Sequence, residues 1–142
     1  MIILDTNVIS EAMRLSPSPA VLGWLRSTPV FELATTTINV AEIGYGLARL
    51  PVGRRRTQLE ASFHNFIGRL FDSRIFGFDA LAADSFAVLA AARDRSGRPF
   101  QRFDGLIAAI ASSRGLEVAT RDIRGFEDCG LAVVNPWNAG TA

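Results

Sequence analysis

The first ten residues, MIILDTNVIS (residues 1–10), decide the fold class. Ile2–Leu4 is a short apolar run typical of a strand, and the three small polar residues that follow it are typical of a helix N-terminus. Residues 7–13 then have the composition of a first helix, which ends at a stretch rich in serine and proline over residues 16–19. The chain is therefore predicted to begin with a short strand that leads directly into a helix.

The same alternation continues to the end of the chain. Thr36 or Thr37 is expected to cap one of the later helices, and Gly115 to close the last one. Short strands interleaved with helices indicate an α/β fold in which a parallel sheet is sandwiched between α-helices. Further helices are predicted over residues 20–26, 37–50, 54–71, 80–95 and 104–114, and further strands over residues 31–35, 74–78, 117–120 and 132–134.

Composition limits the class of protein. The chain has 142 residues, of which 49% are hydrophobic and 20% charged, with a net charge of +1. This length and apolar content fit one compact domain spanning residues 1–142, and they exclude a disordered chain. No stretch approaches the roughly 20 apolar residues of a membrane-spanning helix, and the N-terminus lacks the features of a signal peptide. We therefore expect a cytoplasmic protein with no membrane partner.

Cysteine, histidine and lysine usage removes several kinds of chemistry. One cysteine, Cys129, cannot form an internal disulfide, and one histidine, His64, cannot build a Cys/His zinc site. A nucleophilic Cys129–His64 pair is disfavoured because His64 lies in a predicted helix flanked by arginines. All 15 basic residues are arginine, so mechanisms that require a catalytic lysine are excluded.

Four carboxylates fall where the fold would place a site. Asp5 directly follows the first strand, and Asp122 follows the strand over residues 117–120, so both lie at strand carboxyl ends if the strands are parallel. Asp104 opens an almost wholly apolar, and hence buried, helix. Glu42 lies in the first half of the helix over residues 37–50.

Each acid also has a purely structural interpretation. Asp5 and Asp104 could do no more than cap or stabilise the N-terminus of a helix. Glu42 could pair with Arg49, and Asp122 could be an ordinary acidic residue of a loop. The joint placement of the four acids is what favours a site.

Clustered, partly buried carboxylates repel one another, and a hard divalent cation relieves that repulsion. Mg²⁺ prefers oxygen ligands, which suits Asp and Glu without His. A bound ion of this kind activates water and stabilises charge on a phosphoryl oxygen. An all-carboxylate site therefore points to phosphodiester hydrolysis more than to acyl transfer.

The remaining charge suits a polyanionic substrate. With the four acids neutralised by metal, 15 arginines stand against the ten other acidic residues. Two clusters lie around predicted turns, although basic runs in loops are often simply solvated. The candidates for RNA contact are Arg49, Arg54, Arg55 and Arg56 in the first cluster, and Arg98 and Arg102 in the second, which also includes Arg93 and Arg95.

Ordered motifs span nearly the whole chain: IILDTNVIS (residues 2–10), NVAEIGYG (residues 39–46), DGLIAA (residues 104–109), ATRD (residues 119–122), Phe126 and NPW (residues 135–137). In this order and spacing the chain resembles the PIN-domain ribonucleases, specifically the VapC-type toxins of toxin–antitoxin pairs and their FitB-like members. The motifs are weak one by one, but the ordered set is specific.

This resemblance implies a PIN fold and an endoribonuclease dependent on Mg²⁺ or Mn²⁺. By analogy, Asp5 and Asp104 are the firmest metal ligands, and Glu42 and Asp122 complete the site. Thr6 and Thr120 fall where the family often keeps small polar residues. The resemblance also implies a homodimer and a small antitoxin that blocks the acidic groove. Many relatives have a further acid before the phenylalanine, where this chain has residues 123–125, which leaves a second metal position in doubt.

Two other interpretations compete with this one. Response-regulator receivers and haloacid-dehalogenase-type phosphatases also place an aspartate after the first strand, but both need a lysine, and the phosphatases need a second aspartate where Asn7 stands. A PIN-like module that only binds RNA or a partner would usually lack one of the acids, and all four are present here.

Overall fold

The computed structural model describes residues 1–139 and confirms the predicted alternation of strands and helices. The strands are β1 (Ile2–Leu4), β2 (Leu33–Thr36), β3 (Ile75–Phe76), β4 (Glu117–Ala119) and β5 (Val133–Val134). The helices are α1 (Thr6–Ala12), α2 (Pro19–Ser27), α3 (Thr37–Ala48), α4 (Arg54–Leu70), α5 (Ala80–Arg95) and α6 (Asp104–Arg114). Short 3₁₀ turns are η1 (Val30–Glu32), η2 (Ile123–Phe126) and η3 (Pro136–Asn138).

The five strands form one parallel sheet in the order β3-β2-β1-β4-β5. The chain builds the sheet outward from β1 through β2 to β3, and then crosses back to place β4 on the other side of β1. The order of strands therefore reverses between β1 and β4. In open α/β sheets, ligands bind outside the carboxyl ends of the strands at such a point.

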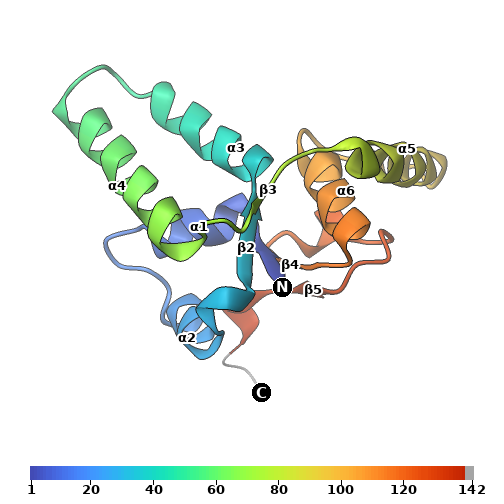
Figure 1. Ribbon diagram of the computed structural model, residues 1–142, viewed down its shortest axis with the longest axis horizontal. Helices are drawn as coiled ribbons and strands as arrows, with labels where there is room; N and C mark the ends of the chain where they lie inside the picture. Colours follow the sequence, from blue (N-terminus) through green and yellow to red (C-terminus); the bar gives the residue numbers. More distant parts are fainter. Residues whose placement is uncertain (140–142) are drawn as a thin grey trace.

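Helices cover both faces of the sheet (Figure 1). On one face, Ile3 and Val118 pack against α6 and the start of α5. On the other face, Leu4, Leu33 and Ala119 pack against α1, α2 and α4. Alternate residues of a strand point to opposite faces, so these short strands are buried on both sides. The fold is the three-layer arrangement that the sequence predicts.

Capping and turn residues in the local sequence determine most of the boundaries of helices and strands. The Thr36 side chain accepts a hydrogen bond from the Asn39 backbone amide (3.1 Å) and so caps α3. Gly115, with φ of +66°, ends α6 in the left-handed conformation that glycine adopts at low cost. Phe63 is buried and Trp24 packs against the same core.

The strand predicted over residues 31–35 is wrong at its start. Phe31 lies in η1, where the Glu32 amide donates to the Pro29 carbonyl (2.9 Å), and its side chain is 68% exposed. Strand β2 begins only at Leu33, from which all four residues are buried. The proline-led turn takes up the residues that an apolar run alone assigns to the strand.

The predicted domain spans residues 1–142, and its last three residues, 140–142, lie outside the described residues. Within residues 1–139, no helix combines the length and hydropathy needed to cross a bilayer.

Candidate active site

The predicted site lies where β1 and β4 end. The Asp5 amide donates to the Ala119 carbonyl (2.9 Å), which closes the ladder between these two strands. Asp5 and Thr120 are therefore the first residues beyond the sheet on adjacent strands. Their position is the one that the reversal of strand order favours for a ligand.

Asp5 is 6% exposed and its carboxylate is hydrogen-bonded on both oxygens. Oδ1 accepts from the Thr6 amide (2.8 Å) and the Asn39 side-chain amide (3.1 Å), while Oδ2 accepts from the Thr120 hydroxyl (2.8 Å) and, more weakly, from Asn7 (3.5 Å). Burial raises the pKa of Asp5, and the hydrogen bond from Thr120 is the largest opposing effect. Asp5 is thus held in one orientation by its neighbours.

Glu42 joins the site through Thr6, whose hydroxyl donates to Oε1 (3.3 Å). Its pKa is raised first by burial and then by the charge of Asp5, and the nearby Arg102 guanidinium lowers it. The alternative pairing of Glu42 with Arg49 is not observed, because the Arg49 guanidinium lies over the Tyr45 ring, 5.5 Å from its centroid. Glu42 therefore faces the acids rather than its own helix surface.

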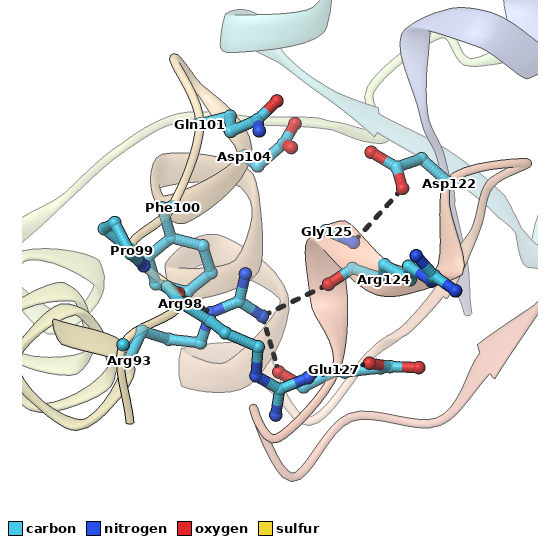
Figure 2. A pocket seen from close by; sticks show the side chains of 11 residues that line it. Arg93, Arg98, Pro99, Phe100, Gln101, Asp104, Asp122, Arg124, Gly125 and Glu127 are labelled. Atoms are coloured by element: carbon cyan, nitrogen blue, oxygen red, sulfur yellow. Dashed lines mark hydrogen bonds and ion pairs between the residues drawn. The ribbon is translucent and has the colours of Figure 1, made fainter. Parts of the chain in front are cut away.

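Asp104 and Asp122 face each other across the mouth of a cavity (Figure 2). Both Oδ2 atoms lie 2.9 Å from the position that a Cβ on Gly125 would occupy, and the Gly125 amide donates to Asp122 Oδ1 (3.2 Å). Gly125 stands in the segment where the family resemblance led us to look for a further acid. A side chain at this position would collide with both carboxylates.

The charges that act on Asp104 show that the four acids form one cluster. Its pKa is raised to about 7, first by burial and then by the charges of Asp5, Asp122 and Glu42, whereas Arg93 lowers it. Every predicted acid therefore contributes to one electrostatic site. A perturbed carboxyl among like charges is typical of functional sites.

A divalent cation fits this cluster by its chemistry. The donors are carboxylate and hydroxyl oxygens, which hard cations prefer, and the mutual repulsion at Asp104 is what such a cation would relieve. As the side chains stand, no group of three or more Asp, Glu, His or Cys residues within residues 1–139 is already arranged to hold a metal ion. Asp5 is fixed by its hydrogen bonds, so closure around an ion would require rotation of the less constrained acids.

The sequence did not single out two asparagines that organise the site. Asn39 is fully buried, donates to Asp5 and to the Thr6 hydroxyl (both 3.1 Å), and shares a 2.6 Å hydrogen bond with the Thr36 hydroxyl. Asn7 donates to the Thr120 hydroxyl (3.1 Å) and accepts from the Arg121 amide (3.1 Å). Both asparagines lie in the motifs over residues 2–10 and 39–46. A polar residue within three positions of an acid is the only feature of the sequence that could have indicated their role.

The candidate RNA-contacting arginines separate into two regions. Arg98 lines the cavity beside Asp104, and Arg102 lies near Glu42, so these two lie beside the acids. Arg49, Arg54, Arg55 and Arg56 instead lie at or near the turn between α3 and α4 (Figure 1), where Arg56 pairs with Glu60 (2.7 Å).

Two residues weighed in the sequence have structural places. Arg93 is buried beneath the cavity. Cys129 lies in the core cluster of α6, whereas His64 lies on exposed α4, so they form no pair.

A family model for the PIN domain matches residues 2–130. The chain belongs to the PIN-domain family. Over 137 residues this PIN domain is 42% identical to VapC ribonuclease Y4jK of Sinorhizobium fredii, covering 96% of the chain and 98% of that protein. It is 38% identical to toxin FitB of Neisseria gonorrhoeae over 138 residues, covering 97% and 99% of the two chains.

The structural comparison agrees. The crystal structure of FitAcB from Neisseria gonorrhoeae matches with a TM-score of 0.89 at 39% identity, covering 96% of this chain and 99% of that one. This PIN domain therefore belongs to the group that includes the VapC ribonucleases and the FitB toxin. The receiver and phosphatase alternatives are excluded by this membership.

Proposed function

We propose that this PIN domain is a metal-dependent endoribonuclease and the toxin of a toxin–antitoxin pair. The observation behind this proposal is the cluster of four acids at the reversal of strand order, in which the charges of the other three acids each raise the pKa of Asp104. Relatives named VapC ribonuclease and tRNA(fMet)-specific endonuclease support RNA as the substrate. Neighbouring structures that are toxin–antitoxin complexes support a cognate antitoxin.

In this proposal, Asp5, Asp104, Glu42 and Asp122 hold Mg²⁺ or Mn²⁺. When bound, such an ion activates a water and offsets charge on the phosphoryl oxygens. Asp5 supplies an oriented carboxylate, because Thr120 and Asn39 fix both of its oxygens. Such a hydrolysis would break the bond between phosphorus and the ribose 3′ oxygen; the water would supply the hydroxyl of the new 5′-phosphate and the proton of the new 3′-hydroxyl.

Thr6 and Thr120 support the acids rather than the substrate. Thr6 joins Asp5 to Glu42 through its amide and hydroxyl, and the Thr120 hydroxyl joins Asp5 to the Asp122 amide (3.0 Å). A small antitoxin that reaches the acids would block this arrangement directly. We also propose that the protein acts in the cytoplasm as a homodimer, as the family resemblance implies.

The test is RNA cleavage by the purified protein in Mg²⁺, Mn²⁺ or EDTA. Asp5→Asn and Asp104→Asn are compared with Asp94→Asn, a matched control on the exposed end of α5. We expect cleavage that needs metal, is lost in the first two variants and persists in the control. Absence of cleavage together with absence of thermal stabilisation by Mn²⁺ would favour a PIN module that only binds RNA or a partner.

A further inference from the structure

A cavity of about 790 Å³ opens beside two of the acids. It lies between the loop that joins α5 to α6, over residues 97–101, and the turn η2. Asp104, Asp122 and Gln101 lie at one end of it, and Arg98 and Phe100 line it further along (Figure 2). Its volume is in the range of small-molecule sites, roughly 300–1,000 Å³.

The cavity is a constructed feature of the fold, because a buried arginine holds its two walls together. Arg93 is 5% exposed. Its Nε donates to the Arg98 carbonyl (2.6 Å), and its Nη1 donates to the carbonyls of Glu127 (2.7 Å) and Arg124 (3.3 Å). A buried guanidinium is costly unless it is fully hydrogen-bonded, so these bonds fix the loop against η2.

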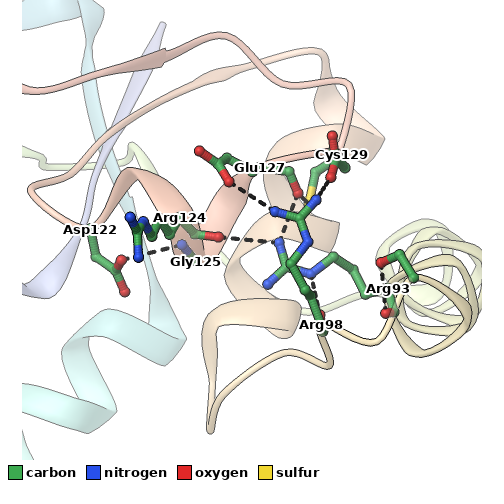
Figure 3. A network of polar contacts seen from close by, with 9 residues as sticks. Arg93, Arg98, Asp122, Arg124, Gly125, Glu127 and Cys129 are labelled. Carbon is green, nitrogen blue, oxygen red and sulfur yellow. Dashed lines mark hydrogen bonds and ion pairs between the residues drawn. The ribbon is translucent and has the colours of Figure 1, made fainter.

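A second tie lies nearer the surface. The Arg98 guanidinium forms ion pairs with Glu127 (3.0 Å) and Asp128. Figure 3 shows that Arg93 and Arg98 bridge the same two segments. Arg93 and Arg98 therefore fix the distance between the two walls of the cavity.

The charge of this lining suits an anion. Arg93 forms no ion pair within residues 1–139, and Figure 2 shows its remaining terminal nitrogen directed into the cavity, toward the end where Asp104 lies. The carboxylates of Asp104, Asp122 and Glu127 balance the arginines of the lining. A divalent cation on the first two acids would leave the cavity with net positive charge.

We propose that this cavity is the subsite for the RNA nucleotide that flanks the scissile phosphate. This inference rests on the proposed endoribonuclease function and names the path of its substrate. A phosphodiester at the acids extends into the cavity, where the Arg93 guanidinium faces its negative charge. Gln101, at the end beside Asp104, presents an amide donor and acceptor to the base.

Two variants at Gln101 test the subsite without altering an acid or an arginine. Gln101→Trp fills the mouth of the cavity, and Gln101→Glu adds negative charge there. Val88→Trp is the control for bulk, because Val88 is exposed on α5, carries no charge and does not line the cavity. Each protein is titrated with a short fluorescein-labelled single-stranded RNA, once in EDTA and once with Ca²⁺ in place of Mn²⁺, and binding is followed by anisotropy at several salt concentrations.

We expect Gln101→Trp to weaken RNA binding about tenfold, as for loss of one good polar contact, and Val88→Trp to bind as wild type. A plot of log affinity against log salt concentration has a negative slope for RNA binding. Gln101→Glu should make this slope less steep by about 0.7, the contribution of one phosphate on a single strand. Stabilisation by Mn²⁺, measured as a melting-temperature shift, should remain in both Gln101 variants. Wild-type affinity in both of them would overturn the subsite.

Other outcomes separate this inference from the proposed function. If the wild type binds and cleaves RNA but the Gln101 variants match it, only the subsite is wrong. If the wild type neither binds RNA nor responds to Mn²⁺, the proposed function fails and the subsite fails with it. Competition by polyglutamate as effective as competition by unlabelled RNA would assign the cavity to an acidic protein segment instead.

Discussion

Replacing Asp104 by asparagine should make the metal-free protein more stable at neutral pH. Asn has the shape of the protonated carboxyl but cannot ionise. In the fold, burial and three neighbouring acids raise the pKa of Asp104 from its usual 3.8 to about 7. The native state therefore holds a proton that the unfolded chain has lost between these two pH values, and the free energy of unfolding must fall as pH rises through that window.

The size of the effect follows from the same numbers. For a fully shielded group, the interval from 3.8 to about 7 would correspond to roughly 4 kcal/mol. Asp104 is only partly buried and solvent screens its charge, so we expect about 1–2 kcal/mol. For a chain of this size, that change raises the melting temperature by roughly 3–6 °C. Asp94→Asn, on the exposed end of α5, should change it by less than about 1 °C.

The assay is urea unfolding in EDTA at a series of pH values. The free energies of unfolding of the wild type and Asp104→Asn should converge below pH 3.8, and well above pH 7 the variant should be more stable by a constant amount. The variant should also gain less from Mn²⁺. A variant that is less stable than the wild type at pH 8 in EDTA would refute repulsion among the acids as the source of the shift.

Three further substitutions test the supports of the site. Asn39→Leu removes one buried donor from the Asp5 carboxylate and the donor to the Thr6 hydroxyl, and should cost roughly 2–3 kcal/mol in urea unfolding; a neutral result would mean that Asp5 does not depend on this bond. Arg93→Met removes the guanidinium hydrogen bonds to three carbonyls and should cost roughly 2–4 kcal/mol, whereas the exposed Arg95→Met should cost nearly nothing. Gly105→Ala, usually favourable within a helix, should instead cost roughly 1–3 kcal/mol, because the added carbon would lie 2.7 Å from the Phe100 ring; a rise in melting temperature would contradict this packing.

The alternation of elements was predictable because each boundary has a local cause. The capping hydroxyl of Thr36 and the left-handed Gly115 act within a few residues of where they stand. The error at Phe31 has the opposite origin. An apolar side chain has no local feature that reveals its exposure, and only the turn after Pro29 moves it out of the sheet.

The acids of the site were predictable for a topological reason. Once the strands are parallel, Asp5 and Asp122 must meet at the same edge of the sheet, whatever the side-chain packing. Asn39 and Arg93 were not predictable in this way. The interactions of Arg93 reach residues 31 and 34 positions later in the chain, so the sequence around it indicates an ordinary exposed arginine in a basic cluster.

Hydrogen bonds favour the ionised form of Asp5, whereas neighbouring acidic charges disfavour the ionised form of Asp104. Hydrogen bonds from Thr120, Thr6 and Asn39 favour the ionised form of Asp5, so the fold fixes one carboxylate as a permanent acceptor. Asp104 receives no such support, and its neighbours disfavour its charge. A purely structural cluster would be more stable with a neutral residue at position 104. The charge of Asp104 is disfavoured by the fold itself, and under the proposed function a divalent cation held by the acids would make that charge favourable.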